Sequence, residues 1–172
     1  YTTVLNSKGQ MILGMADMNN YEKSYNFNKF LNFKKKIIIF DLNFSLKNIK
    51  SLILKNSLFN TICVSGTSGH KIYKIKNLLK NINILILNKQ ECLNLANKKD
   101  IISSLKFLIN KNKDLTIVIT NGKNTVNAYN KEIIYKCRPL KTKVKNENKA
   151  GDVMSAFFCF FYLQSLSFSD IL

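Results

Sequence analysis

The sequence predicts an α/β fold with a mostly parallel β-sheet that is covered by helices on both faces. Two observations predict it. Between residues 37 and 120, short runs of β-branched and aliphatic residues alternate with longer segments whose apolar residues recur at helical spacing. Strand–helix–strand units at this spacing form right-handed crossovers, and these crossovers build parallel sheets.

The chain is expected to begin with a β-hairpin. Two apolar runs, at 1–5 and 11–16, flank a polar turn that contains Gly9. A polar cluster at 17–19 then ends the second strand, and we predict a weakly patterned helix over residues 21–33.

The alternating region follows. Strands are predicted at 37–41, 61–64, 82–87 and 115–120, and helices at 45–59, 72–79, 89–96 and 100–110. After Gly122 the pattern changes to two short strands, at 125–129 and 133–137, joined as a hairpin. An apolar helix then opens at Asp152, and its aromatic cluster at 157–162 is expected to pack in the core. Both ends of the sequence look cut, so we expect an internal piece of a longer protein.

The chain is strongly basic, with a formal net charge of +17. Lysine supplies nearly all of it, since Arg138 is the single arginine. Lysine, asparagine and isoleucine share A/T-rich codons, so a biased genome explains the charge. Nucleic acid is a disfavoured partner because the lysines are scattered and arginine, the usual base-contacting residue, is almost absent. No apolar run reaches the ~18–20 residues of a membrane span, so no membrane partner is expected.

Cysteine and histidine are placed unfavourably for zinc. The four cysteines form no CxxC pair, and His70 is the single histidine, in a loop that we expect at the surface. Buried free thiols in a reducing compartment are the simplest interpretation. This favours an intracellular, cytoplasmic protein.

Polar residues follow each predicted strand, at 41–43, 65–67, 88–91 and 120–122. In an open parallel sheet these positions gather at one edge, where ligands bind. The segment 149–152 adds a small-residue turn that brings Asp152 to a helix N-terminus. An anion held there would lie beside a carboxylate able to accept a proton, which is what phosphoryl transfer needs. The alternative is that Asp152 only caps the helix.

Three of these segments resemble motifs of the ribokinase-like (PfkB) carbohydrate kinases, in the same order and spacing. Asn88-Lys89-Gln90-Glu91 is similar to the NxxE motif, Thr120-Asn121-Gly122 to a strand exit that contacts ATP, and Ala150-Gly151-Asp152 to the end of the GAGD signature. The resemblance implies a single domain over 1–172, with a three-layer αβα sandwich at 37–172 and a small β lid at 1–19. Segments 1–11, 16–19 and 41–45 resemble the pseudouridine kinases of that family.

The resemblance also implies roles for individual residues. Asp152 would be the general base for the 5′-hydroxyl of pseudouridine, and the Ala150, Gly151 and Asp152 amides would form an anion hole. The cofactors would be ATP and Mg²⁺, with Asn88, Thr120 and Gly122 contacting ATP. Glu91, with Asn88 beside it, would organise Mg²⁺ through its waters. Asp17 and Asn19 would contact the nucleoside, and the lid would support a homodimer.

Two alternatives stay open beside this hypothesis. One is a kinase of the same fold that acts on ribose, adenosine or another sugar. The other is a degenerate, non-catalytic nucleotide-binding fold, since Lys149 stands where GAGD has its first Gly and Thr125 replaces a loop glycine.

Overall fold

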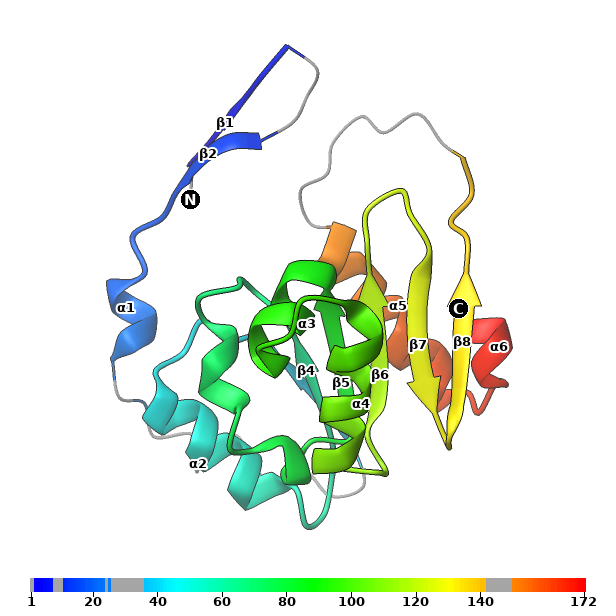
Figure 1. Ribbon diagram of the computed structural model, residues 1–172. Coiled ribbons are helices and arrows are strands. Elements are labelled where there is room, and N and C mark those ends of the chain that lie inside the picture. The colour runs from blue at the N-terminus through cyan, green and yellow to red at the C-terminus, as the bar shows by residue number, and fades with distance from the viewer. Residues whose placement is uncertain (1, 8–10, 24, 26–35, 142–149) are drawn as a thin grey trace.

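The computed structural model describes residues 2–7, 11–23, 25, 36–141 and 150–172 (Figure 1). Several expectations concern other positions. The first hairpin residue, the hairpin turn with Gly9, most of the predicted helix at 21–33 and Lys149 lie outside the described residues.

Six strands form the central sheet in the order β3-β4-β5-β6-β7-β8, and β1 and β2 form a separate antiparallel hairpin. Strands β3 to β6 are parallel, whereas β7 and β8 continue the sheet antiparallel. The predicted α/β class and mostly parallel sheet are therefore confirmed. The strands are β1 (Thr2–Leu5), β2 (Met11–Met15), β3 (Ile37–Phe40), β4 (Thr61–Ser65), β5 (Ile84–Asn88), β6 (Thr116–Thr120), β7 (Val126–Asn130) and β8 (Ile133–Cys137).

Helices cover both faces of this sheet. In Figure 1, α2, α3 and α4 lie in front of it and α5 and α6 lie behind it, while the β1–β2 hairpin stands away from the body. The helical segments are α1 (Asn19–Glu22), α2 (Leu46–Asn56), η2 (Ile72–Ile75), η3 (Leu79–Asn81), α3 (Lys89–Ala96), α4 (Ile101–Lys111), α5 (Ala150–Leu163) and α6 (Phe168–Ile171).

The helix predicted over residues 72–79 is wrong in type, because two short 3₁₀ segments stand there. Their backbone bonds run from residue i to i+3, as in Lys76 N–H to the Tyr73 carbonyl at 3.1 Å. The buried residues Ile72, Ile75 and Leu78 recur every third position, which suits a 3₁₀ turn. Between them the buried Lys74 ammonium donates to two backbone carbonyls of the β3–α2 turn, so a non-local contact fixes this segment.

The helix predicted from residue 21 is short within the described residues. It ends at Glu22, and the backbone of the next residue, Lys23, is extended. The Asn48 side chain, buried on α2, donates to the Lys23 carbonyl at 2.7 Å and accepts from the Tyr25 N–H at 3.3 Å. These contacts take backbone groups that a continuing helix would use.

Two hydrophobic clusters fill the spaces on either side of the sheet. The larger lies under α2, η2, α3 and α4, and the smaller lies under α5 and α6. The aromatic cluster on α5 divides between core and surface: Phe158 is 1% exposed, whereas Phe157 and Phe160 are 58% and 56% exposed. The prediction that the whole cluster packs in the core is therefore wrong, because only one face of the helix meets the sheet.

Three of the four cysteines are buried free thiols, as expected, whereas Cys137 is only half-buried. The Cys159 thiol on α5 donates to the Cys63 sulfur on β4 at 3.4 Å and ties this helix to the sheet. The contact with the Cys159 thiol and burial both raise the pKa of Cys63, since the close pair resists loss of the Cys63 proton. His70 is exposed, as predicted. Among the described helices, none is long and apolar enough to span a membrane.

Candidate active site

A small cavity of about 60 Å³ lies where β4, β5 and β6 end and α5 begins. Parallel strands end at the same edge of a sheet, so polar residues far apart in sequence meet there. The cavity is lined by Ser65, Gly66, Ile86, Leu87, Asn88, Glu91, Thr120, Gly151 and Met154. The structure thus brings together four of the predicted site residues, namely Asn88, Glu91, Thr120 and Gly151.

The first turn of α3 positions Asn88 and Glu91 through a capping box. Asn88 Oδ1 accepts from the Glu91 N–H at 2.9 Å, and Glu91 Oε2 accepts from the Asn88 N–H at 2.8 Å. The Asn88 side chain is exposed, whereas Glu91 is only 3% exposed. Burial raises the pKa of Glu91, and the hydrogen bond from the Asn88 backbone partly offsets this. A cation bound beside this carboxylate would favour its ionised form.

Gly66 allows the Glu91 carboxylate to occupy this place. A Cβ at Gly66 would lie 2.1 Å from Glu91 Oε2 and 2.6 Å from its Cδ. The Gly66 N–H donates to the Ile86 carbonyl at 2.8 Å, so the backbone at this point is held against β5. A residue with a side chain at position 66 would force the carboxylate out of its cap.

The exit of β6 supplies Thr120 and Gly122. The Thr120 hydroxyl donates to the Leu87 carbonyl at 3.4 Å and lines the cavity. Gly122, two residues further, has a φ of +55°, a conformation that favours glycine. The residue is exposed, and no described atom lies within 4 Å of the place that a Cβ would take, so the turn is open to a ligand.

The first turn of α5 contains Ala150, Gly151 and Asp152, so the helix opens at Ala150 among the described residues rather than at Asp152 as predicted. The N–H groups of a first helical turn have no intrahelical acceptor, and the helix dipole adds partial positive charge there. All three residues are exposed, and no described atom lies within 4 Å of where a Gly151 Cβ would stand. The described residues therefore leave space beside the Gly151 backbone, which lines the cavity.

Two residues at or beside the site were missed by sequence reasoning, Met154 and Ser155. Met154 lines the cavity, and the buried Ser155 hydroxyl lies 2.8 Å from the Ser65 hydroxyl. The Ser155 hydroxyl also donates to the Gly151 carbonyl at 2.9 Å, so it connects the start of α5 to the end of β4. The sequence does carry a signal for Ser155, because it is a hydroxyl residue in an apolar helix and lies four residues after Gly151.

Asp17 and Asn19 lie apart from these residues. Asp17 Oδ1 accepts from the Asn19 N–H at 3.0 Å, and both side chains are exposed where the hairpin leads into α1. Neither lines the cavity. Figure 1 shows the hairpin standing away from the sheet.

The donor set at the cavity fits Mg²⁺ held mainly through water. Glu91 Oε1 accepts no hydrogen bond from the residues that the structure describes, so one carboxylate oxygen is left for a cation or its waters. Mg²⁺ commonly uses one or two carboxylates, with waters and phosphate oxygens as its other ligands. In the described part of the chain, no three acidic, cysteine or histidine side chains cluster as an all-protein metal site would require.

Structural comparison finds kinases of one fold. A carbohydrate kinase from Agrobacterium tumefaciens superposes with a TM-score of 0.70 at 22% identity, over 96% of this chain and 55% of that one. Phosphofructokinase-2 from Escherichia coli, solved with fructose-6-phosphate, superposes with a TM-score of 0.69 at 18% identity, over 82% of this chain and 49% of that one. Adenosine kinase from Sinorhizobium meliloti superposes with a TM-score of 0.67 at 16% identity, over 78% of this chain and 45% of that one.

These likenesses show that the chain has the ribokinase-like α/β fold of sugar and nucleoside kinases. The chain spans about half the length of the structures that it matches. No protein-family model and no curated protein sequence matches it.

Proposed function

We propose that this chain carries the phosphoryl-transfer site of an ATP-dependent sugar or nucleoside kinase. The observation that carries the proposal is the cavity in which a buried Glu91, Asn88, Thr120 and the open first turn of α5 meet. The fold shared with sugar and adenosine kinases supports the same conclusion.

In the proposed reaction, Asp152 accepts the proton of the substrate hydroxyl as its oxygen attacks the γ-phosphorus of ATP. The bond between that phosphorus and the β–γ bridging oxygen breaks, and ADP leaves. The N–H groups of Ala150, Gly151 and Asp152, in the first described turn of α5, would donate hydrogen bonds to the transferring group and stabilise its negative charge, since the first N–H groups of a helix have no intrahelical acceptor. Phosphoryl transfer depends mostly on such positioning and charge stabilisation.

Glu91 and Asn88 would hold Mg²⁺ and its waters, which would neutralise charge on the ATP phosphates. The Asn88 Oδ1 atom is engaged in the helix cap, so its side-chain Nδ2 is the group left to donate to a phosphate oxygen. Thr120 and the exposed Gly122 backbone would contact the nucleotide from the neighbouring strand exit.

The proposed acceptor is the 5′-hydroxyl of pseudouridine, and its support is the resemblance of segments 1–11, 16–19 and 41–45 to pseudouridine kinases. Asp17 and Asn19 would reach the nucleoside once the hairpin closes over the site as a lid. Exposed apolar side chains on the hairpin, such as Ile12 and Leu13 at 67% and 51%, supply a surface for a lid or for a homodimer through it. Ribose, adenosine or another sugar is the alternative substrate.

The test is turnover with ATP, Mg²⁺ and a panel of pseudouridine, uridine, ribose and adenosine. It is applied to the 172-residue chain and to any longer polypeptide that carries it. Asp152→Asn should lower kcat by about 10²-fold or more, because general-base catalysis contributes on that scale. Asp114→Asn, at an exposed loop carboxylate, is the matched control and should leave kcat unchanged.

Three outcomes separate the hypotheses. Preference for ribose or adenosine would overturn pseudouridine as the substrate and keep the kinase. Nucleotide binding without transfer would support the non-catalytic alternative suggested by Lys149 and Thr125. Undiminished turnover in Asp152→Asn would overturn the proposed mechanism.

A further inference from the structure

We propose that a basic groove on the α3–α4 side of the molecule is a second ligand site, for a small polyphosphate anion. The groove has a volume of about 510 Å³, within the ~300–1,000 Å³ range of small-molecule sites. It lies between the η2–η3 segment and the C-terminal ends of α3 and α4. This site is independent of the function proposed above.

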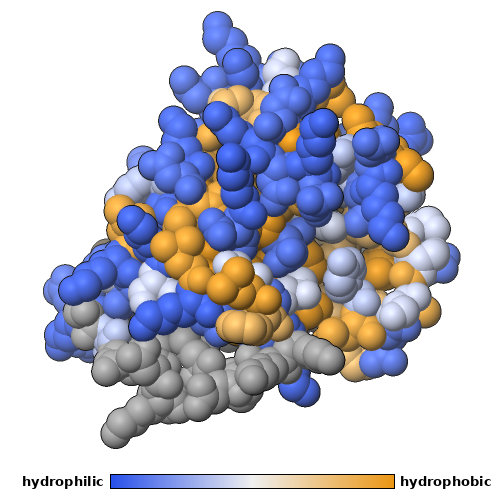
Figure 2. Space-filling model, turned by 90° about the horizontal axis from the view of Figure 1, so that it is seen from below, coloured by the Kyte–Doolittle hydropathy of each residue, from blue (hydrophilic) through white to orange (hydrophobic). Residues whose placement is uncertain are grey.

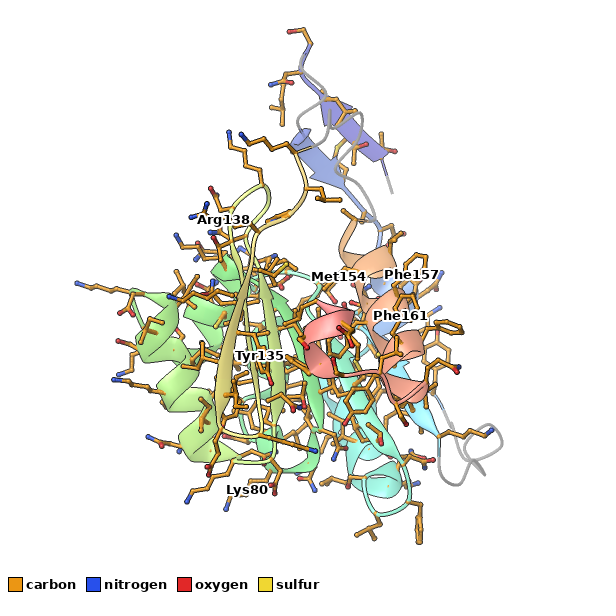
Figure 3. All side chains as sticks on the ribbon, turned by 90° about the vertical axis from the view of Figure 1, so that its right-hand side faces the viewer. Lys80, Tyr135, Arg138, Met154, Phe157 and Phe161 are labelled. Atoms are coloured by element: carbon orange, nitrogen blue, oxygen red, sulfur yellow. The ribbon has the colours of Figure 1, made fainter. Side chains whose placement is uncertain are left out.

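The groove and the candidate active site lie at opposite ends of the sheet. η3 precedes β5, and the last turn of α4 precedes β6, so the groove faces the amino ends of those strands. The cavity beside Glu91 lies at their carboxyl ends. In Figure 3, Lys80 of the groove lies toward the lower end of the molecule, and Met154 of the cavity lies near the start of α5 above it.

Four lysines line the groove and no acidic residue does. They are Lys76, Lys80, Lys98 and Lys111, which come from three separate segments of the chain. All four are exposed, and within the described residues none of their ammonium groups forms an ion pair or a hydrogen bond. Figure 2, which views the molecule from this end, shows hydrophilic side chains gathered over much of the face. Four unpaired positive charges around one concavity raise the local concentration of anions.

Lysines at helix C-termini often serve only to balance the helix dipole. The backbone at the end of α3 is satisfied in another way, however. The N–H groups of Asn97 and Lys98 donate to the carbonyls of Asn94 and Leu93 at 3.3 and 3.1 Å, in a left-handed cap at Asn97. The Lys98 ammonium group is therefore left for a ligand.

The remaining lining groups suit a phosphorylated ligand with an apolar or aromatic part. Phe107 is half-buried in the groove, and the Lys111 ammonium lies 5.5 Å from the centre of its ring. The side-chain amides of Asn77 and Asn97 add hydrogen-bond donors. The shared chemistry is a chain of phosphates, which either inorganic triphosphate or a nucleoside triphosphate presents; only the second would also use the Phe107 ring.

The experiment is titration calorimetry of inorganic triphosphate into the chain, without Mg²⁺, at two salt concentrations. The variant Lys80→Gln/Lys98→Gln/Lys111→Gln should weaken binding at least tenfold. The control Lys47→Gln/Lys50→Gln/Lys136→Gln removes the same charge from exposed positions on α2 and β8 and should change binding by less than twofold. Equal weakening in both variants, or no binding by the unaltered chain, would overturn the site.

A second arm distinguishes the ligand source and the active site. ATP is titrated while backbone amide NMR shifts are followed at Asn97 in the groove and at Asn121 near the cavity. If the shifts at Asn97 report a higher affinity for ATP than for inorganic triphosphate, and Phe107→Leu lowers the ATP affinity to that of triphosphate, the ligand is a nucleotide. Equal binding identifies the phosphates alone. Shifts at Asn121 without any at Asn97 would contradict the groove and leave the proposed kinase intact.

Discussion

Gly66→Ala tests the geometry of the candidate site most directly. The new Cβ would stand 2.1 Å from Glu91 Oε2, well inside van der Waals contact. The Gly66 backbone is bonded to β5, so the carboxylate is the group that must move. Its displacement breaks the 2.8 Å hydrogen bond from the Asn88 N–H and leaves that donor at the helix start without its partner.

Loss of a helix-capping interaction costs about 1–2 kcal/mol, so Gly66→Ala should lower the free energy of unfolding by roughly 2 kcal/mol. The φ of Gly66 lies outside the left-handed region, so alanine itself is not strained there. In a Glu91→Ala background the clash is absent, and the same substitution should be neutral or stabilising by up to ~1 kcal/mol. The expected coupling energy is therefore about 2 kcal/mol.

Urea denaturation at neutral pH of the four proteins in this cycle gives the coupling. Gly69→Ala is the matched control, since its Cβ would meet the exposed Asn94 amide at 2.5 Å, which can rotate away. That control should cost less than about 1 kcal/mol. A Gly66→Ala penalty of equal size with and without Glu91 would refute the argument that the glycine exists to admit the carboxylate.

Three further predictions concern pH, packing and thiol reactivity. Burial raises the pKa of Glu91 above its ordinary value, so the contribution of this side chain to stability is present below about pH 4.5 and is lost as pH rises through the folded-state pKa. Urea denaturation between about pH 4 and about pH 8 should therefore show the Glu91→Gln variant becoming more stable relative to the parent chain as pH rises. A stability difference that does not change with pH would contradict this. In the same assay, Phe158→Ala should lower the free energy of unfolding by about 3–5 kcal/mol and Phe157→Ala by less than about 1 kcal/mol, because only the Phe158 side chain is buried. Equal losses in the two variants would contradict the packing of the Phe158 face of α5 against the sheet. A thiol-reactive disulfide reagent should modify Cys137 rapidly and the three buried cysteines only on unfolding, so a fast phase that survives Cys137→Ser would disprove the assignment.

Most of the sheet could be predicted from the sequence because its strands are nearly continuous aliphatic runs. Val, Ile and Leu at 61–64, 82–87 and 115–120 have no polar alternation, which is typical of strands buried on both faces. The described strands begin and end within two residues of these predictions. The antiparallel pair β7–β8 was expected from the hairpin-like turn between them, where Lys131 and Glu132 adopt positive φ.

The elements that were predicted wrongly depend on contacts between distant residues. The 3₁₀ segments at 72–81 are fixed by Lys74, whose ammonium reaches the Leu42 and Phe44 carbonyls about thirty residues away in sequence. The aromatic run on α5 is hydrophobic on every side, so its pattern cannot indicate which face meets the sheet. Both outcomes are decided by tertiary structure that a local pattern does not contain.

The candidate site shows the same limit most clearly at Asn88 and Glu91. An Asn followed three residues later by Glu is also a capping box, and the structure forms that capping box in full. Local capping therefore explains both residue types with no function at all. It does not explain why Glu91 is 3% exposed, since a capping carboxylate is equally effective in water.

Burying this carboxylate works against stability, because desolvation raises its pKa. The carboxylate nevertheless lies against Gly66, which fits only because it lacks a Cβ, and in a cavity that Thr120 and Gly151 also line. Each of these residues comes from a different element, and none of them is needed to begin α3. A buried carboxylate lowers the stability of the fold, yet three separate segments surround its cavity, and such a combination is typical of a functional site. The buried carboxylate in a cavity that the first described turn of α5 also lines is therefore the strongest structural argument for the proposed kinase chemistry.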